Sequence, residues 1–232
     1  MIDPVNNQWQ FAYDSSGSLT NLTDPLGNAM AMTYSALHLP TTITDARGYT
    51  TTMTYDAQGN LLTFTDPLGK TTTMTYDSTG KMLTRTNPLS QTETYTYDGN
   101  GNLATRTDQL GHTWSWTYDG SGRKTSETNP LGETTAWIYL FGGQIAIETN
   151  PLGGTKYFGY AADGRLILVD DELGNRTEWG YDHRGLAVTK TDPAGKVTVY
   201  GYDDDRRLET VIDPNGLHDV LRVQPCWPNR LN

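Results

Sequence analysis

The stretch TFTDPLGKTTTMTYDSTGKMLTRTNPLS, residues 63–90, states one pattern almost twice. Asp-Pro-Leu-Gly at 66–69 returns as Asn-Pro-Leu-Ser at 87–90, and a threonine-rich run that ends in Tyr-Asp lies between them. The two copies are 21 residues apart. A repeat at a fixed short period has to be recognised before any single residue is interpreted, because it decides the fold.

Tyrosines mark this period along the whole chain. They recur every 21 residues without an insertion, at Tyr13, Tyr34, Tyr55, Tyr76, Tyr97, Tyr118, Tyr139, Tyr160, Tyr181 and Tyr202. Asp or Asn keeps a second phase at the same spacing, from residue 3 to residue 213. This unbroken register predicts a single repeat array over residues 1–217, followed by a tail outside the repeat over residues 218–232.

Each repeat contains two turn sequences and two strand sequences. Asp66, Pro67 and Gly69 form a type I turn signal, in which Asp bonds the local backbone, Pro presets φ and Gly accepts the left-handed conformation. Asp77 and Gly80 repeat this chemistry without proline. Residues 70–76 and 81–86 are predicted strands because they are rich in Thr and aromatic residues. Turns this short make neighbouring strands antiparallel, and no helical periodicity is present.

Alternation along the strands predicts two different faces. Met74 and Tyr76 lie on one face with other aromatic, Met and Leu side chains, and the opposite face is largely Thr. The apolar burial within one hairpin does not offset the conformational entropy lost when its residues become ordered, so neighbouring repeats must stabilise each other. The expected fold class is therefore all-β: tandem hairpins in a long, curved antiparallel strip or spiral. Which face of the strip lies inward stays open.

Composition narrows the function classes. The chain has 232 residues, 35% of them hydrophobic, and a mean hydropathy of −0.59, which does not favour a thick core. A net charge of −10 argues against nucleic acid or an anionic membrane as the main partner. The single cysteine, Cys226, excludes an internal disulfide and a multi-thiolate metal site. We find no signal peptide and no apolar stretch of membrane-spanning length.

Enzymatic chemistry has little support in the sequence. The four histidines occupy unrelated phases of the repeat, so nothing gathers them, and no nucleophile motif is present. Residues 98–102 imitate the start of a calcium-binding loop, but Leu103 stands where the loop glycine belongs. We therefore interpret this segment as a turn, and predict no catalytic, metal-binding or cofactor-binding residue.

Four tryptophans offer an alternative function. Trp114, Trp116, Trp137 and Trp179 could form stacking platforms for sugars, in a carbohydrate-binding or cell-wall-binding module. The competing interpretation is that they pack within the strip, as cross-strand aromatic pairs commonly do. Period and phase fit both hypotheses, and we favour packing.

The repeated Tyr-Asp-x-x-Gly-x-Leu motif, followed by Thr-x-Thr-(Asp/Asn)-Pro-Leu-Gly, resembles the YD repeat of the Rhs (rearrangement hotspot) family. YDAQGNLLTFTDPLG (55–69) and YDGNGNLATRTDQLG (97–111) carry the resemblance most clearly, and it extends over residues 3–217. Similar repeats occur in the C component of insecticidal Tc toxins and in teneurins. The resemblance implies a strip that spirals into a hollow shell around a C-terminal toxin.

The resemblance also sets expectations for partners and location. It implies a non-catalytic shell segment that encloses or presents a toxin for delivery to neighbouring or host cells. Its strand edges are expected to pair with further Rhs repeats or with another copy of the chain. Cell-surface glycans are a partner only under the alternative function. The expected location is outside a bacterium or on its surface, reached without a signal peptide.

Overall fold

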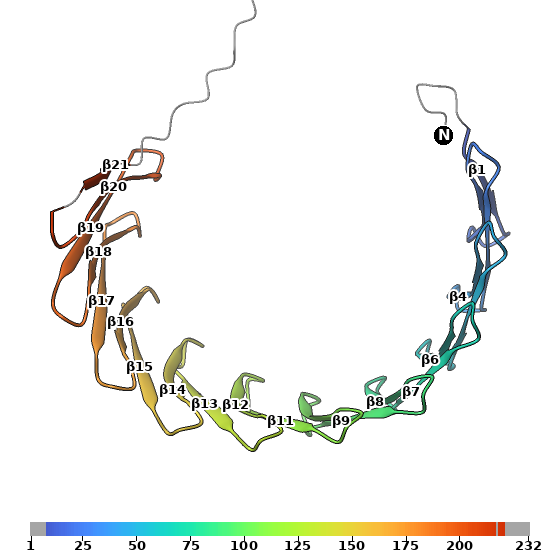
Figure 1. Cartoon of the computed structure of the whole chain (residues 1–232), viewed down its shortest axis with the longest axis horizontal. Coiled ribbons are helices and arrows are strands. Elements are labelled where there is room, and N and C mark those ends of the chain that lie inside the picture. The colour runs from blue at the N-terminus through green and yellow to red at the C-terminus, as the bar shows by residue number, and fades with distance from the viewer. Residues whose placement is uncertain (1–7, 217, 221–232) are drawn as a thin grey trace, which may run out of the picture. The chain divides into compact units, whose positions relative to one another are not determined.

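The computed structural model describes residues 8–216 and 218–220, and within these ranges it contains strands and turns but no helix. The chain divides into two compact units, Met1–Ser115 and Trp116–Asn232. The boundary between them falls inside one strand, β11 (Thr113–Tyr118), and not between two repeats. Within each unit the strands follow one another in chain order (Figure 1).

The strands are of two kinds, and both recur with the sequence period. Outgoing strands end on a repeat tyrosine: β1 (Gln10–Tyr13), β3 (Ala29–Tyr34), β5 (Thr50–Tyr55), β7 (Thr71–Tyr76), β9 (Thr92–Tyr97), β11, β13 (Thr134–Tyr139), β15 (Thr155–Tyr160), β17 (Arg176–Tyr181) and β19 (Val197–Tyr202). Return strands follow them: β2 (Leu19–Thr23), β4 (Pro40–Thr44), β6 (Leu61–Thr65), β8 (Met82–Thr86), β10 (Leu103–Thr107), β12 (Lys124–Thr128), β14 (Ile145–Thr149), β16 (Leu166–Asp170), β18 (Ala187–Thr191) and β20 (Leu208–Ile212). The predicted all-β fold of tandem antiparallel hairpins is confirmed.

Pairing within a hairpin differs from pairing between hairpins. In the hairpin of β7 and β8, four residue pairs form, from Thr73↔Thr86 to Tyr76↔Met82, with a bulge just before the tyrosine. Between β6 and β7, which belong to successive repeats, three pairs form and all lie near the Asp-Pro turn. The contact between successive repeats is therefore open at the end that carries the Tyr-Asp turn.

The last strand, β21 (His218–Val220), pairs with β20 in the register that joins earlier repeats. It begins one residue past the predicted end of the array at residue 217. Residue 217, the predicted end of the array, and residues 221–232 of the predicted tail lie outside the described residues.

Both turns of a repeat have the same geometry. The backbone N–H of Gly69 donates to the Asp66 carbonyl at 2.9 Å, and Gly69 has φ of 76°. One carboxylate oxygen of Asp66 accepts the N–H groups of Leu68 and Lys70, both at 2.9 Å. The Asp77 turn repeats these bonds, with Gly80 at φ 85°. Because the carbonyl of Lys70 also accepts the Asp66 N–H, Lys70 closes the turn, and β7 begins one residue later than the sequence predicts.

Replacing Gly69 with Val should lower the free energy of unfolding by more than about 1 kcal/mol. A Cβ at this position would meet no atom within 4 Å, so the cost comes from the left-handed backbone and not from a clash. Ser90, at the equivalent position, already holds φ of 62° without being glycine, so Ser90→Gly should raise stability. Urea denaturation checks both. An unchanged midpoint in Gly69→Val would contradict the turn assignment.

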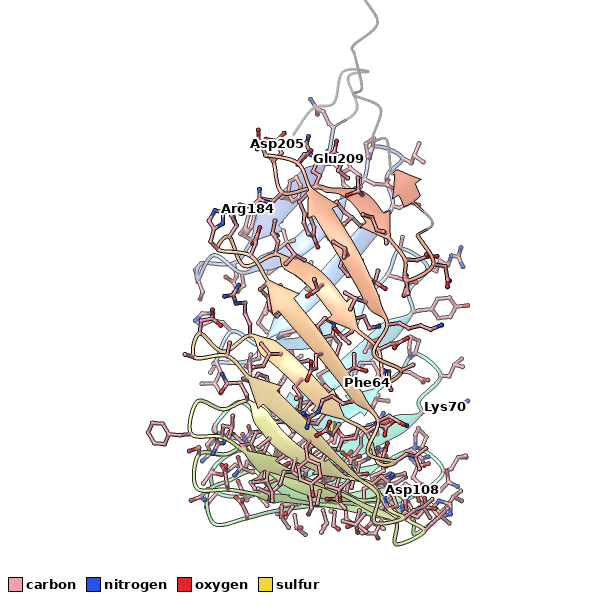
Figure 2. The ribbon with its side chains drawn as sticks, turned by 90° about the vertical axis from the view of Figure 1, so that its left-hand side faces the viewer. Phe64, Lys70, Asp108, Arg184, Asp205 and Glu209 are labelled. Carbon is pink, nitrogen blue, oxygen red and sulfur yellow. The ribbon has the colours of Figure 1, made fainter. Side chains whose placement is uncertain are left out.

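Within each unit, the described strands have no second layer packed on them, so the core is thin. None of their side chains is fully buried, and Met74 and Glu93 are the most covered, each 8% exposed. We call the side that carries Met74 and Tyr76 the tyrosine face, and the side that carries Thr73 and Thr75 the threonine face. Figure 2 shows side chains projecting from both sides of the strands.

Threonine hydroxyls link neighbouring strands on the threonine face. Thr75 and Thr84 pair at 2.7 Å within a hairpin, and Thr65 and Thr71 pair at 2.8 Å between hairpins. Equivalent contacts of 2.6–2.8 Å join Thr33–Thr42, Thr44–Thr50, Thr54–Thr63, Thr86–Thr92, Thr96–Thr105, Thr107–Thr113, Thr117–Ser126 and Thr128–Thr134. The abundant threonine thus replaces a packed second layer with cross-strand hydrogen bonds.

Candidate functional site

The repeat tyrosines join successive hairpins. The Tyr76 hydroxyl donates to the backbone carbonyl of Leu61, the first residue of the preceding return strand, at 3.0 Å. Leu61 lies beyond the three pairs that connect β6 and β7. The tyrosine therefore closes the contact between repeats at the end where the backbone ladder stops.

The same bond recurs along both units. It joins Tyr34 to Leu19, Tyr55 to Pro40, Tyr97 to Met82, Tyr139 to Lys124, Tyr160 to Ile145, Tyr181 to Leu166 and Tyr202 to Ala187, at 2.7–3.0 Å. Tyr118 ends β11. The residues that supply the acceptor carbonyl are of different types, so the sequence pattern predicted the tyrosines but not their hydrogen-bond partners. The available signal was that no position of the series holds phenylalanine.

Cationic side chains reinforce the same contact in the second unit. Arg123 lies over the Tyr139 ring at 4.9 Å and donates to the Leu140 carbonyl at 2.9 Å. Arg165 makes the equivalent ring contact with Tyr181 at 4.9 Å. Arg184, labelled at a Tyr-Asp turn in Figure 2, donates to a carbonyl of the next such turn at 3.2 Å.

The first strand differs from the other outgoing strands at this contact. Nothing among the described residues pairs with the outer edge of β1, and Tyr13 is 60% exposed. Trp9 and Phe11, on the same face, are 41% and 45% exposed. In the other outgoing strands, the equivalent tyrosine is only partly exposed. The β1 edge is therefore one half of a contact whose other half is a return strand.

A charged cluster interrupts the apolar stripe on the tyrosine face. Glu93 accepts a hydrogen bond from Arg106 at 2.5 Å and another from the Tyr95 hydroxyl at 3.1 Å, and Arg85 lies 3.6 Å away. Arg106 also covers the ring of Trp114 at 5.4 Å. The register opposes Arg85 with Glu93, and sequence reasoning missed this pairing because the two residues belong to different repeats.

The Glu93 cluster predicts a pH dependence of stability. The hydrogen bond from Arg106, aided by the one from Tyr95, holds the pKa of Glu93 below its ordinary value of 4.5. A carboxylate with a lowered pKa in the folded state stabilises the fold above about pH 4.5, and this contribution disappears as pH falls through the lower value. Glu93→Gln should cost about 1 kcal/mol at pH 7, since both arginines are well exposed.

Urea midpoints at pH 7 and pH 3 measure this effect. Other carboxylates also titrate, so the informative quantity is the difference between the native chain and Glu93→Gln. That difference should shrink at the lower pH. Glu133→Gln, at an exposed turn, is the matched control. A constant difference at both pH values would contradict the assigned role of Glu93.

The four tryptophans are partly covered by neighbouring side chains. Lys124 lies 6.0 Å from the ring of Trp116 and 5.9 Å from that of Trp137. The indole of Trp137 donates to Glu148 at 3.0 Å, and Trp179 faces Lys190 in the register. These contacts, with Arg106 on Trp114, favour packing over open stacking platforms. Sugar stacking on these four rings stays a prediction.

The acidic turn at 98–102 is satisfied internally. One carboxylate oxygen of Asp98 accepts the backbone N–H groups of Asn100 and Asn102, and the other accepts the Asn102 amide at 3.0 Å. Over the ranges 8–216 and 218–220, no group of three or more His, Cys, Asp or Glu residues is placed to hold a metal ion. The same residues include no helix long and apolar enough to cross a membrane.

Exposed leucines occupy the turns equivalent to Asp66–Gly69, which begin with Asp-Pro, Asn-Pro, Asp-Gln or Asp-Glu. They are 76–96% exposed: Leu26, Leu68, Leu89 and Leu110 in the first unit, and Leu131, Leu152 and Leu173 in the second. Arg47 makes the same bond to its turn aspartate as Leu68 does, so the turn itself does not require leucine. Lys70 and Asp108 mark two of these turns in Figure 2.

Comparison with known proteins identifies the repeat. The teneurin YD-shell family model matches residues 69–219, and the RHS repeat model matches residues 34–63. No curated protein matches the chain.

Several solved structures are similar to the strip. The Photorhabdus luminescens Tc holotoxin pore aligns at 16% identity and a TM-score of 0.45, over 88% of this chain and 14% of that one. A TcdB2-TccC3 complex without its hypervariable C-terminal region aligns at 15% identity and 0.44, with the same coverage. A porin-like protein from Bacteroides uniformis aligns at 16% identity and a TM-score of 0.27, over 84% of each chain. The chain thus spans about a seventh of the Tc chains, and these scores add nothing to the family match.

Proposed function

Since the chain belongs to the YD-shell family of Rhs-type repeat proteins, we propose that it works as a wall segment of a larger shell. The wall is a strip of hairpins that further YD repeats lengthen by adding to its edges. In this role the tyrosines and turns hold the wall together and catalyse nothing.

One observation carries the proposal. The internal repeats are joined by a three-pair ladder and a tyrosine hydroxyl bond, and β1 presents the tyrosine half of that contact, with Tyr13 60% exposed and no return strand beside it in residues 8–216 and 218–220. An edge with unpaired backbone groups and exposed aromatic side chains is a template for another strand. The strand that fits is the return strand of a YD hairpin, since that strand covers every equivalent edge inside the array.

Lengthening the chain in register tests this role. A copy of residues 43–63, placed before Met1, keeps the 21-residue phase and brings a return strand with the carbonyl of Leu61 to β1. The lengthened chain should have a higher urea midpoint. Tyr13→Phe should cost about 1 kcal/mol in the lengthened chain and close to nothing in the original one.

The matched control is the same block without Thr63, the residue next to Met1, so that Leu61 and every residue before it shift by one position relative to β1. A shift of one residue turns every side chain of a strand to the opposite face, so the shortened block should add no stability. Equal midpoints for the two blocks, or an equal effect of Tyr13→Phe in both chains, would refute the proposed contact.

The wall is proposed to enclose or present a toxin polypeptide outside a bacterium or at its surface. Membership in a shell family supports enclosure, and the acidic charge of −10 does not favour nucleic acid as the content. The test is co-expression with the polypeptide encoded next to this chain, followed by limited proteolysis. Protection of that polypeptide only in the presence of the shell supports enclosure, and equal digestion with and without it contradicts it.

A further inference from the structure

Residues at equivalent positions of the repeats can be compared with one another, and one group of residues on the threonine face differs from its equivalents. Tyr157, Asp170 and Arg176 occupy positions where most other repeats hold Thr, Ser or Ala. Neighbouring Gly154 occupies a position at which every other repeat has a side chain. The wall does not require Tyr157, Asp170 or Arg176, because other repeats form it with Thr, Ser or Ala at these positions.

The register brings the three side chains into one row. Tyr157 on β15 lies opposite Asp170 on β16, and Asp170 lies opposite Arg176 on β17. The guanidinium of Arg176 donates two bonds to the Asp170 carboxylate, both at 2.8 Å. This bidentate pair fixes the orientation of both charged groups, which stay accessible on their outer side.

The row borders a groove at the adjoining turns 150–153 and 171–174. The groove has a volume of about 560 Å³, and its lining includes Gly153, Gly154, Tyr157, Asp170, Glu172 and Arg176. Tyr157 is 51% exposed, and no described residue bonds its hydroxyl. A Cβ on Gly154 would lie 2.8 Å from Glu172, so the glycine leaves the room that the Glu172 side chain takes.

We propose that this groove binds a neutral sugar unit of an oligosaccharide. The C–H face of a pyranose packs on an exposed aromatic ring, as Tyr157 offers. Its neighbouring hydroxyls can donate to a carboxylate and accept from a guanidinium, and the Asp170–Arg176 pair presents both at fixed spacing. A concave site with one aromatic wall and a few oriented polar groups is typical of small-ligand sites.

The charges around the groove exclude anionic ligands. Asp170, Glu172 and Glu178 lie around the row, against Arg176 and Lys156, so the local charge is negative. A phosphorylated or sulfated ligand would be repelled. The inference goes beyond the wall function and uses none of the four tryptophans.

Titration of the full chain with neutral hexasaccharides tests the inference. Cellohexaose, maltohexaose and chitohexaose are the probes, and backbone amide shifts in NMR report binding and its place. At least one probe should bind below about 10 mM, with shifts at residues 153–157 and 170–176. Tyr157→Thr should weaken it by at least about tenfold.

Reversion to the repeat pattern supplies variants that keep the fold. Thr is the native residue at these positions in other repeats, so the variant with Tyr157→Thr, Asp170→Thr and Arg176→Thr should fold and lose binding. Tyr49→Thr, which removes a tyrosine that is 53% exposed elsewhere, should bind like the native chain. No binding of any probe, unchanged binding in the triple variant, or tighter binding of a sulfated heparin hexasaccharide would overturn the inference.

Discussion

Deleting Thr52 from β5 should unfold the repeats around it, at a cost above about 4 kcal/mol. Thr52 pairs with Thr42 on one side and Thr65 on the other. Without it, either the residues before the deletion or those after it turn to the wrong face of the sheet. If the residues after the deletion turn, Tyr55 loses its bond to the Pro40 carbonyl and the Thr54–Thr63 pair breaks; if the residues before it turn, the Thr44–Thr50 pair breaks.

Deleting a whole repeat should be far milder, although it removes 21 times as many residues. Removal of residues 45–65 joins Thr44 to Asp66, so an intact Asp-Pro turn again follows a return strand. The Pro40 carbonyl, which accepts Tyr55 in the native chain, becomes the acceptor for Tyr76. Thr44 meets Thr71 as Thr65 did. The remaining repeats keep every type of contact and lose only one copy of it.

Urea denaturation followed by circular dichroism compares the two deletions. The 21-residue deletion should retain a cooperative transition with a modestly lower midpoint, and the single deletion should lose or split the transition. If the single deletion were the milder one, the stacking of identical hairpins in fixed register would not be what stabilises this fold.

The strands and turns were predictable because every local signal in a repeat agrees with the others. Asp66 and Gly69 specify a turn, the residues after them specify a strand, and the next Asp and Gly specify a second turn. The period then repeats this answer without a gap, so an error in one repeat is corrected by its neighbours. The strand boundaries differ from expectation by about one residue because the turn bonds extend past the glycine.

The bonds that join repeats were not predictable in the same way. The acceptor of each tyrosine hydroxyl is a backbone carbonyl, and residues as different as Leu61, Pro40 and Lys124 supply it. A side-chain pattern cannot reveal such a partner. The constancy of tyrosine, where phenylalanine would pack equally well, was the only trace of it.

The pairing of charges depends on the register across repeats. In the sequence, Arg85 and Glu93 are scattered charges on either side of a turn, and only the three-pair ladder between β8 and β9 places them opposite each other. The row of Tyr157, Asp170 and Arg176 arises in the same way. Departures from a repeat therefore become informative once the register shows which of them are neighbours.

Tyr76→Ala should lower the free energy of unfolding by about 3 kcal/mol, and Tyr76→Phe by about 1 kcal/mol. The first change removes the ring and the hydroxyl, and the second removes only the bond to the Leu61 carbonyl. The ring is partly covered, so the cost of its loss should fall at the lower end of the range for a buried aromatic residue. Urea midpoints and slopes give both values.

Tyr13 is the matched control, because it is a repeat tyrosine that has no preceding return strand among the described residues. At 60% exposure and with no return strand of the described residues beside it, its hydroxyl can be removed at almost no cost. The contrast between Tyr13→Phe and Tyr76→Phe isolates the bond between repeats from the intrinsic effect of losing a phenol. Equal effects of the two changes would mean that the hydroxyl bond does not hold the hairpins together, and the account of the wall would then rest on the backbone ladder and side-chain packing alone.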